Sequence, residues 1–142
     1  MTEYATPTNT TNPIMNPVLY WRVSAVALAA TAVLGIILNA IDQPNLLGED
    51  FLAFDWTHNI VHIVLAGAAF VFGFANLPGN IVKTFAIVFG VVYAGLGIVG
   101  FITGVVDGLE ETLSLHLEIG ENIVHLLLGG WALVAGFGAR YE

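Results

Sequence analysis

Four side chains near the start of two apolar segments have the types and spacing that metal binding requires. His58 and His62 are four positions apart, and Glu121 and His125 repeat this spacing later in the chain. Residues i and i+4 lie on one face of a helix, so each pair would present two ligating groups in one direction. Four-helix bundles bind metals with inward-facing carboxylates and imidazoles. His58, His62, Glu121 and His125 therefore form a candidate site for zinc, copper or iron.

Other interpretations of these residues stay open. His62 and His125 alone could bind a cofactor, ligating haem or a chlorophyll-like pigment from two sides. Alternatively, the histidines and neighbouring asparagines only hydrogen-bond across helices and hold down loops, at roughly 0.6–2 kcal/mol for each polar pair. A proton relay or an ion path is a further alternative, but the segments below the cluster supply almost no polar side chains.

The composition indicates which kind of element must position the cluster. Hydrophobic residues make up 57% of the 142 residues, charged residues make up 10%, and the mean hydropathy is +0.84. Soluble domains carry about 25% charged residues, so this chain belongs in lipid. The absence of cysteine excludes disulfides and thiolate metal sites. The chain has only three Lys and Arg residues and a net charge of −8, so it cannot neutralise the phosphates of a nucleic acid.

Four apolar segments are long enough to cross a bilayer, which takes about 20 helical residues. The sequence predicts spans at Leu19–Ile41, Trp56–Ala75, Ile81–Val106 and Gly120–Gly138. We expect residues 1–18 to form a flexible cytoplasmic tail and residues 19–142 to form the transmembrane domain. The predicted fold is all-α: an integral membrane four-helix bundle made of two parallel helical-hairpin repeats, with cytoplasmic N and C termini.

The few cations predict the orientation of the bundle. With four spans, Arg22, Lys83 and Arg140 all fall at one face of the membrane, and the positive-inside rule makes that face cytoplasmic. The four histidines and most carboxylates then lie at the opposite, outer face. Tyr20, Trp21, Trp56 and Tyr141 are expected to form an interfacial aromatic belt.

The two halves of the chain repeat each other. Aligned without gaps, residues 56–74 and 119–137 are identical at ten of nineteen positions, including the shared run Asn-Ile-Val-His. The preceding segments also correspond, because GIILNAID ends at Asp42 and GFITGVVD ends at Asp107. Repeat one would cover about 19–78 and repeat two about 79–142. Each copy crosses twice, so the copies would be related by a pseudo-twofold axis along the membrane normal.

Small residues recur at helical spacing along three of the segments. We expect these stripes to face the bundle axis and the histidines to point inward with them, since small residues allow close helix approach. The glycine-rich face of the third segment is also a predicted docking surface for other subunits. The three stripes are Ala66, Ala69 and Gly73; Gly97, Gly100 and Gly104; and Gly129, Ala132 and Gly136.

The chain resembles an uncharacterised family of bacterial and archaeal four-helix membrane proteins (domain of unknown function 4383). The resemblance rests on His58-Asn59-Ile60-Val61-His62 with Gly67, and on Asn122, His125 and Gly129. It covers about residues 19–138 and implies a four-helix membrane fold. It implies no activity.

The function predicted from the sequence is that of a small non-enzymatic multi-pass protein of the cell membrane. It would be a structural or accessory component of a larger membrane assembly, or a homo-oligomer. Its partners would be membrane lipid and either other membrane subunits or further copies of itself. The alternative is a metal-binding or haem- or pigment-binding protein that uses the histidine and carboxylate cluster.

Overall fold

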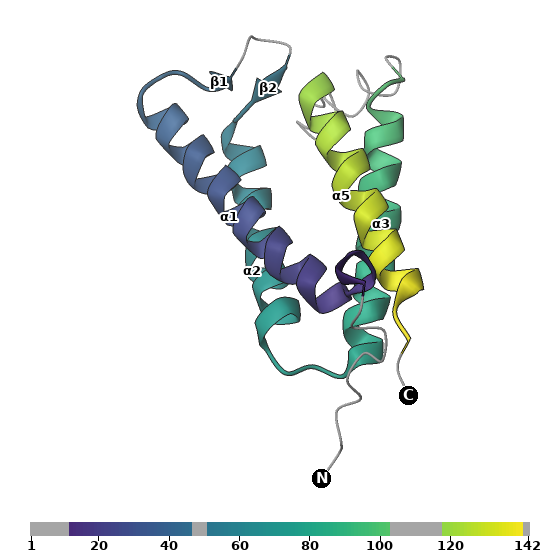
Figure 1. Cartoon of the computed structure of the whole chain (residues 1–142). Coiled ribbons are helices and arrows are strands. Elements are labelled where there is room, and N and C mark those ends of the chain that lie inside the picture. The colour runs from purple at the N-terminus through teal and green to yellow at the C-terminus, as the bar shows by residue number, and fades with distance from the viewer. Residues whose placement is uncertain (1–11, 47–50, 103–117, 141–142) are drawn as a thin grey trace.

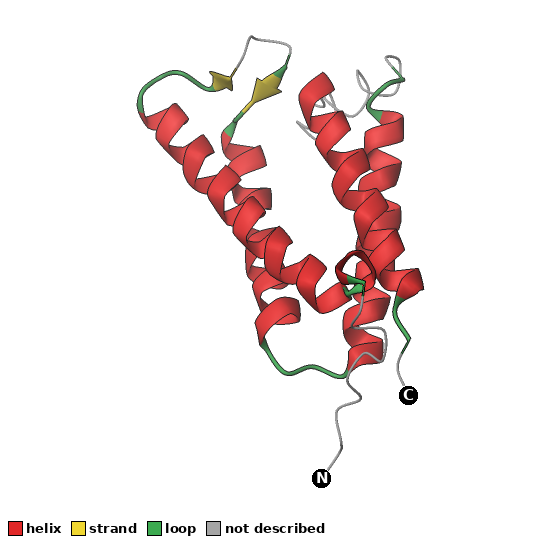
Figure 2. Cartoon of the chain, in the orientation of Figure 1, coloured by secondary structure: helices red, strands yellow, loops and turns green. Residues whose placement is uncertain are grey.

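The described residues form four long helices arranged as two hairpins (Figures 1 and 2). The computed structural model describes residues 12–46, 51–102 and 118–140. In the first hairpin α1 (Pro17–Ala40) packs on α2 (Trp56–Phe74), and in the second α3 (Gly79–Val99) packs on α5 (Ile119–Gly138). All four helices are long and apolar enough to cross a membrane. The predicted helical, membrane-compatible fold is therefore confirmed.

Helix α3 ends earlier than the sequence predicted, at Val99 and not at Val106. The chain tightens after Gly100, where the amide of Ile102 donates to the carbonyl of Val99 at 2.8 Å. The side chain of Asn122 donates to the Gly100 carbonyl at 2.8 Å, which satisfies one of the acceptors that a helix end leaves free. The predicted positions Gly104, Asp107 and His116 lie outside the described residues.

Helix α1 ends in a Schellman motif that the sequence did not predict. The amide of Gln43 donates to the Leu38 carbonyl at 2.9 Å, and Asp42 adopts a left-handed φ of 55°, which aspartate tolerates better than bulkier residues do. A short antiparallel pair of strands follows, β1 (Asn45–Leu46) and β2 (Leu52–Ala53). This pair leads the chain into α2 at the end of the molecule opposite both termini (Figure 1).

The end of the predicted flexible tail is ordered. Residues Pro13–Met15 form a short 3-10 helix, η1, and the Asn12 side chain caps it by accepting the amide of Ile14 at 3.0 Å. The indole nitrogen of Trp131 on α5 donates to the carbonyl of Ile14 at 3.0 Å. Residues 12–18 of the predicted tail are therefore part of the folded bundle, and residues 1–11 lie outside the described part of the chain.

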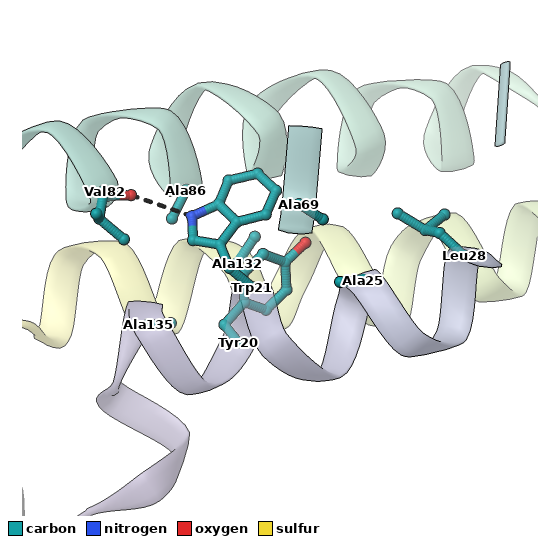
Figure 3. Packing of buried hydrophobic residues seen from close by; sticks show 9 residues of the cluster. All are labelled: Tyr20, Trp21, Ala25, Leu28, Ala69, Val82, Ala86, Ala132 and Ala135. Atoms are coloured by element: carbon teal, nitrogen blue, oxygen red, sulfur yellow. Dashed lines mark hydrogen bonds between the residues drawn. The ribbon is translucent and has the colours of Figure 1, made fainter. Parts of the chain in front are cut away.

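The two hairpins meet through an aromatic core near the end that carries both termini (Figure 3). The indole of Trp21 on α1 donates to the Val82 carbonyl on α3 at 3.2 Å, and its ring lies 5.3 Å from that of Phe89. Tyr20 packs edge-on against Trp131 at 5.2 Å. Tyr20 and Trp21 are 0% and 2% exposed, so their predicted place in an interfacial belt is wrong.

The small-residue stripes pack between the two helices of each hairpin. The expectation that they face the axis between the hairpins is therefore wrong. A Cβ at Gly73 on α2 would lie 2.9 Å from the backbone nitrogen of Arg22 on α1. A Cβ at Gly97 on α3 would lie 2.7 Å from Cγ of Leu126 on α5, and one at Gly100 would overlap the Asn122 side chain. The glycine-rich face of α3 is therefore occupied by α5 and is not a free docking surface.

Two of the three cations cap helix C-termini. Arg22 Nε donates to the Gly73 carbonyl at 2.8 Å, near the end of α2. Lys83 Nζ donates to the Ala139 carbonyl at 2.9 Å, just beyond α5. Each cation meets the negative end of a helix dipole, and each links the two helices of one hairpin.

Candidate functional site: a crevice between the hairpins

The predicted cluster is assembled where α2 and α5 begin. The Asp55 carboxylate caps α2 by accepting the amide of His58 at 2.7 Å, which fixes the first turn and the direction of the His58 side chain. On α5, Glu121 lies in the first turn and is 5% exposed. Nδ1 of His58 lies 2.7 Å from Oε1 of Glu121, so this pair joins one hairpin to the other.

The other two predicted residues lie one turn deeper and face the same space. The rings of His58 and His62 are 4.2 Å apart and meet edge to face. The ring of His125 lies 4.8 Å from Tyr93 on α3, also edge to face. His62 and His125 both line the two cavities between the hairpins. The structure therefore brings His58, His62, Glu121 and His125 together, as the sequence predicted.

A crevice separates the two hairpins, and the side chains of this cluster divide it into two cavities. The larger cavity, of about 450 Å³, lies between α2 and α3 and is lined mainly by apolar side chains. The smaller one, of about 230 Å³, lies between α1 and α5. Five residues line both cavities and so form the polar centre of the crevice: His58, His62, Tyr93, Glu121 and His125. We call this set the polar centre.

Several polar atoms of the polar centre are buried without a hydrogen bond to any described residue. They are Nε2 of His58, Nδ1 of His62, Nδ1 of His125 and Oε1 of Glu121, the last of which contacts His58 without the geometry of a hydrogen bond. An unsatisfied buried polar atom costs about 1–3 kcal/mol, and more in hydrocarbon, where water cannot compensate. A group that could hydrogen-bond with these nitrogens would recover part of that cost, so the arrangement suits a bound polar group.

No metal-binding group is found at the polar centre among the described residues. Within residues 12–46, 51–102 and 118–140, no group of three or more histidines and carboxylates is placed so that it could hold a metal. Nδ1 of His58 instead contacts the Glu121 carboxylate at 2.7 Å. The four predicted ligands thus share one crevice but do not form a coordination shell.

The asparagines that neighbour the histidines in the sequence lie outside the polar centre and have a structural role. Asn59 and Asn122 are each 1% exposed and pack within their own hairpins. Asn122 donates to Gly100, and the Asn59 side chain occupies the space that a Cβ at Gly35 would need. Asn39 on α1 also donates to the carbonyls of Gly35 and Phe54. These contacts hold the helices that carry the histidines.

Sequence reasoning missed Tyr93, which is 5% exposed and belongs to the polar centre. Its ring stacks on Phe89 at 4.0 Å and carries the only hydroxyl that α3 contributes to either cavity. A signal was present, because Tyr93 is the one polar aromatic residue in the apolar segment 81–106.

The outer end of the crevice is bridged by the loop of the first hairpin. The backbone amide of Gly120, at the start of α5, donates to the carbonyl of Phe51 at 3.0 Å. Phe54, 3% exposed, lies beside the polar centre with its ring 5.4 Å from that of His58. The β1–β2 segment therefore joins the two hairpins at the end opposite the aromatic core (Figure 1).

Fold and site define a class: a four-helix protein with membrane-compatible spans, whose two hairpins enclose a crevice with a buried histidine–glutamate pair. Scans against protein-family models, the curated proteins and the solved structures found no match to this chain.

Proposed function

We propose that this chain is a small non-enzymatic protein of the cell membrane that crosses the bilayer four times. In this proposal it works as a subunit of a larger membrane assembly or as a homo-oligomer, embedded in lipid. The connection between α2 and α3 spans only residues 75–78, which leaves little surface for a substrate site at that end of the helices. Membership of the four-helix family that the sequence resembles would fit this role without adding an activity.

The observation that carries the proposal is a set of three helical glycines with open space beside them, Gly67, Gly95 and Gly130. A Cβ at Gly67 on α2 or at Gly130 on α5 would have no described atom within 4 Å. Exposed small residues let a neighbouring helix approach closely in a membrane, where packing and polar contacts drive association. The first hairpin has one such position and the second has two, Gly95 and Gly130, so the protein could contact partners on more than one side.

The internal repeat is supported by matching contacts in the two hairpins. Asn59 packs against Gly35 in the first hairpin, and Asn122 packs against Gly100 in the second. Both pairs fall at aligned positions of the two half-sequences. We infer that the hairpins are copies of one unit that lie parallel in the membrane, with both termini and the cationic end in the cytoplasm.

Cysteine labelling tests this orientation, because the natural chain has no cysteine. The exposed residues Gln43 and Asn76 lie in connections at opposite ends of the helices. We expect a membrane-impermeant maleimide added to intact cells to label Gln43→Cys. Asn76→Cys should react only after the membrane is opened. The reverse pattern would contradict cytoplasmic termini.

The association itself is tested at the open glycines. We expect Gly67→Leu and Gly130→Leu to reduce the mass of the protein particle in mild detergent, measured by light scattering, because the added side chains block close helix approach. The fold should survive, since both positions border open space. The matched control is Val64→Leu, on the same helix at a position that is 64% exposed. A monomer of unchanged mass in wild type and variants would contradict the proposal.

A second candidate function is binding of a ligand by the polar centre. It is favoured by the convergence of His62, His125 and the His58–Glu121 pair on one crevice. The metal-bound and haem- or pigment-bound forms of this function predict a stoichiometric metal or a Soret-type absorption band in gently purified protein.

A further inference from the structure

We propose that the larger cavity binds a lipid-soluble quinone, with the ring at the polar centre and the hydrocarbon tail along the apolar wall between α2 and α3. This inference goes beyond the proposed function, because it concerns a small-molecule ligand and does not depend on the assembly state of the protein. It rests on the position of the cavity, the chemistry of its two ends and its size.

The position of the cavity favours a ligand that arrives from the membrane. The cavity lies between two helices that are apolar enough to span a bilayer. Its outer end is bridged by the Phe51–Gly120 hydrogen bond, and its inner end meets the aromatic core at Trp21 and Phe72. The sides between α2 and α3 face the hydrocarbon region, so a lipid-soluble molecule has the most direct path.

The polar end matches a head group that both accepts and donates hydrogen bonds. Three histidines that line the cavity, His58, His62 and His125, each carry a buried nitrogen that lacks a described partner. An imidazole N–H can donate to a quinone carbonyl, and an imidazole nitrogen or the Glu121 carboxylate can accept from a quinol hydroxyl. One set of residues would therefore suit both states of a quinone.

Charge argues against an anionic head group. The polar centre contains the carboxylate of Glu121, and Asp55 also lines the larger cavity. The cations Arg22 and Lys83 are used at the other end of the helices, where they cap α2 and α5. A phosphate or a haem propionate would therefore meet negative charge without a cation, whereas a neutral quinone ring meets no such penalty.

Size and shape fit an aromatic ring with part of a chain. The volume of about 450 Å³ lies within the range of roughly 300–1,000 Å³ that is usual for small-molecule sites. Aromatic side chains supply flat walls, since Phe72 stacks on Phe85 at 4.5 Å and Phe89 stacks on Tyr93 at 4.0 Å. Ala68 leaves room between these rings on the α2 side.

The test is equilibrium binding of decylubiquinone to the full chain in phosphatidylcholine nanodiscs. Binding is followed by quenching of tryptophan fluorescence, since Trp21 lines the cavity, with empty nanodiscs as the blank. We expect saturable binding of one quinone per chain. Decylbenzene, which has the ring and tail but no carbonyl oxygens, should bind at least about tenfold more weakly because it leaves the imidazole nitrogens unpaired.

Substitutions locate the bound quinone. His62→Leu and His125→Leu should each weaken decylubiquinone binding by about tenfold, and Ala68→Phe should abolish it by filling the cavity. Val64→Phe is the matched control, because Val64 is 64% exposed and does not belong to the residues that line the cavity. Its affinity should equal that of wild type. Circular dichroism of each variant checks the fold.

A photoreactive azidoquinone tests wild-type protein without any substitution, and we expect its crosslinks within residues 61–72 and 85–96. Equal affinity for decylbenzene, retained binding in Ala68→Phe or crosslinks confined to outer helix faces would each overturn the proposal. So would a stoichiometric metal or a Soret-type band in the purified protein. The particle mass measured for the assembly is a separate readout, so failure of either proposal is recognised independently.

Discussion

Gly97→Leu is expected to lower the free energy of unfolding by about 3 kcal/mol, at the upper end of the usual cost of overpacking. A Cβ at this position would lie 2.7 Å from Cγ of Leu126 and 2.9 Å from the backbone oxygen of Asn122. Backbone atoms cannot move away without separating α3 from α5. The loss can be measured by titrating the protein with dodecyl sulfate in mixed micelles while following helicity by circular dichroism.

Gly95→Leu provides the matched control for this effect. Gly95 lies two residues away on α3, and a Cβ there would have open space among the described residues. Leucine also has a higher helix propensity than glycine, so this variant should be as stable as wild type or slightly more stable. Equal destabilisation by both substitutions would show that α3 and α5 do not pack as described.

His58→Leu is expected to destabilise the protein by about 3 kcal/mol. The substitution removes the contact of 2.7 Å to Glu121 and leaves a carboxyl group that is 5% exposed without its partner across the crevice. Losing one member of a buried pair costs more than the pair itself contributes, because the remaining polar group stays desolvated. The same unfolding titration measures this effect.

The double variant His58→Leu/Glu121→Leu separates that cost from other effects. Replacing both members by apolar residues should restore most of the lost stability, since no buried polar group is then unpaired. The coupling between the two substitutions should be of the same order as the loss in the single variant. If the two losses simply add, the side chains do not interact, and the link between the hairpins at this end is wrong.

Much of the fold could be predicted from the sequence, because helix number and approximate position follow from apolar length alone. The bounds of α2 and α5 were predicted to within one residue. The end of α3 could not be found in this way, because the segment to Val106 remains apolar and the helix ends where Asn122 captures a carbonyl from a different helix. Contacts between distant residues decide such boundaries.

The sequence predicted which residues make up the candidate site, but it did not predict the crevice in which they lie. The spacing of His58, His62, Glu121 and His125 correctly indicated one shared space. The sequence could not show that the small residues pack within hairpins and leave a crevice between them, since a stripe of glycines does not specify its partner helix. Tyr20 and Trp21 were misplaced for a similar reason, because buried and interfacial aromatic residues look alike in an apolar segment.

The hydrogen bond from Trp131 to the carbonyl of Ile14 spans 117 positions, and this has a consequence for biogenesis. Ile14 acquires this partner only after α5 has been synthesised and inserted. Hairpins of local contacts can form early, whereas closing so long a segment waits for the final helix. Until α5 is in place, the first hairpin must therefore reside in the membrane without the Trp131 ring that covers Tyr20. Nascent chains that stop before α5 should consequently be recognised and degraded.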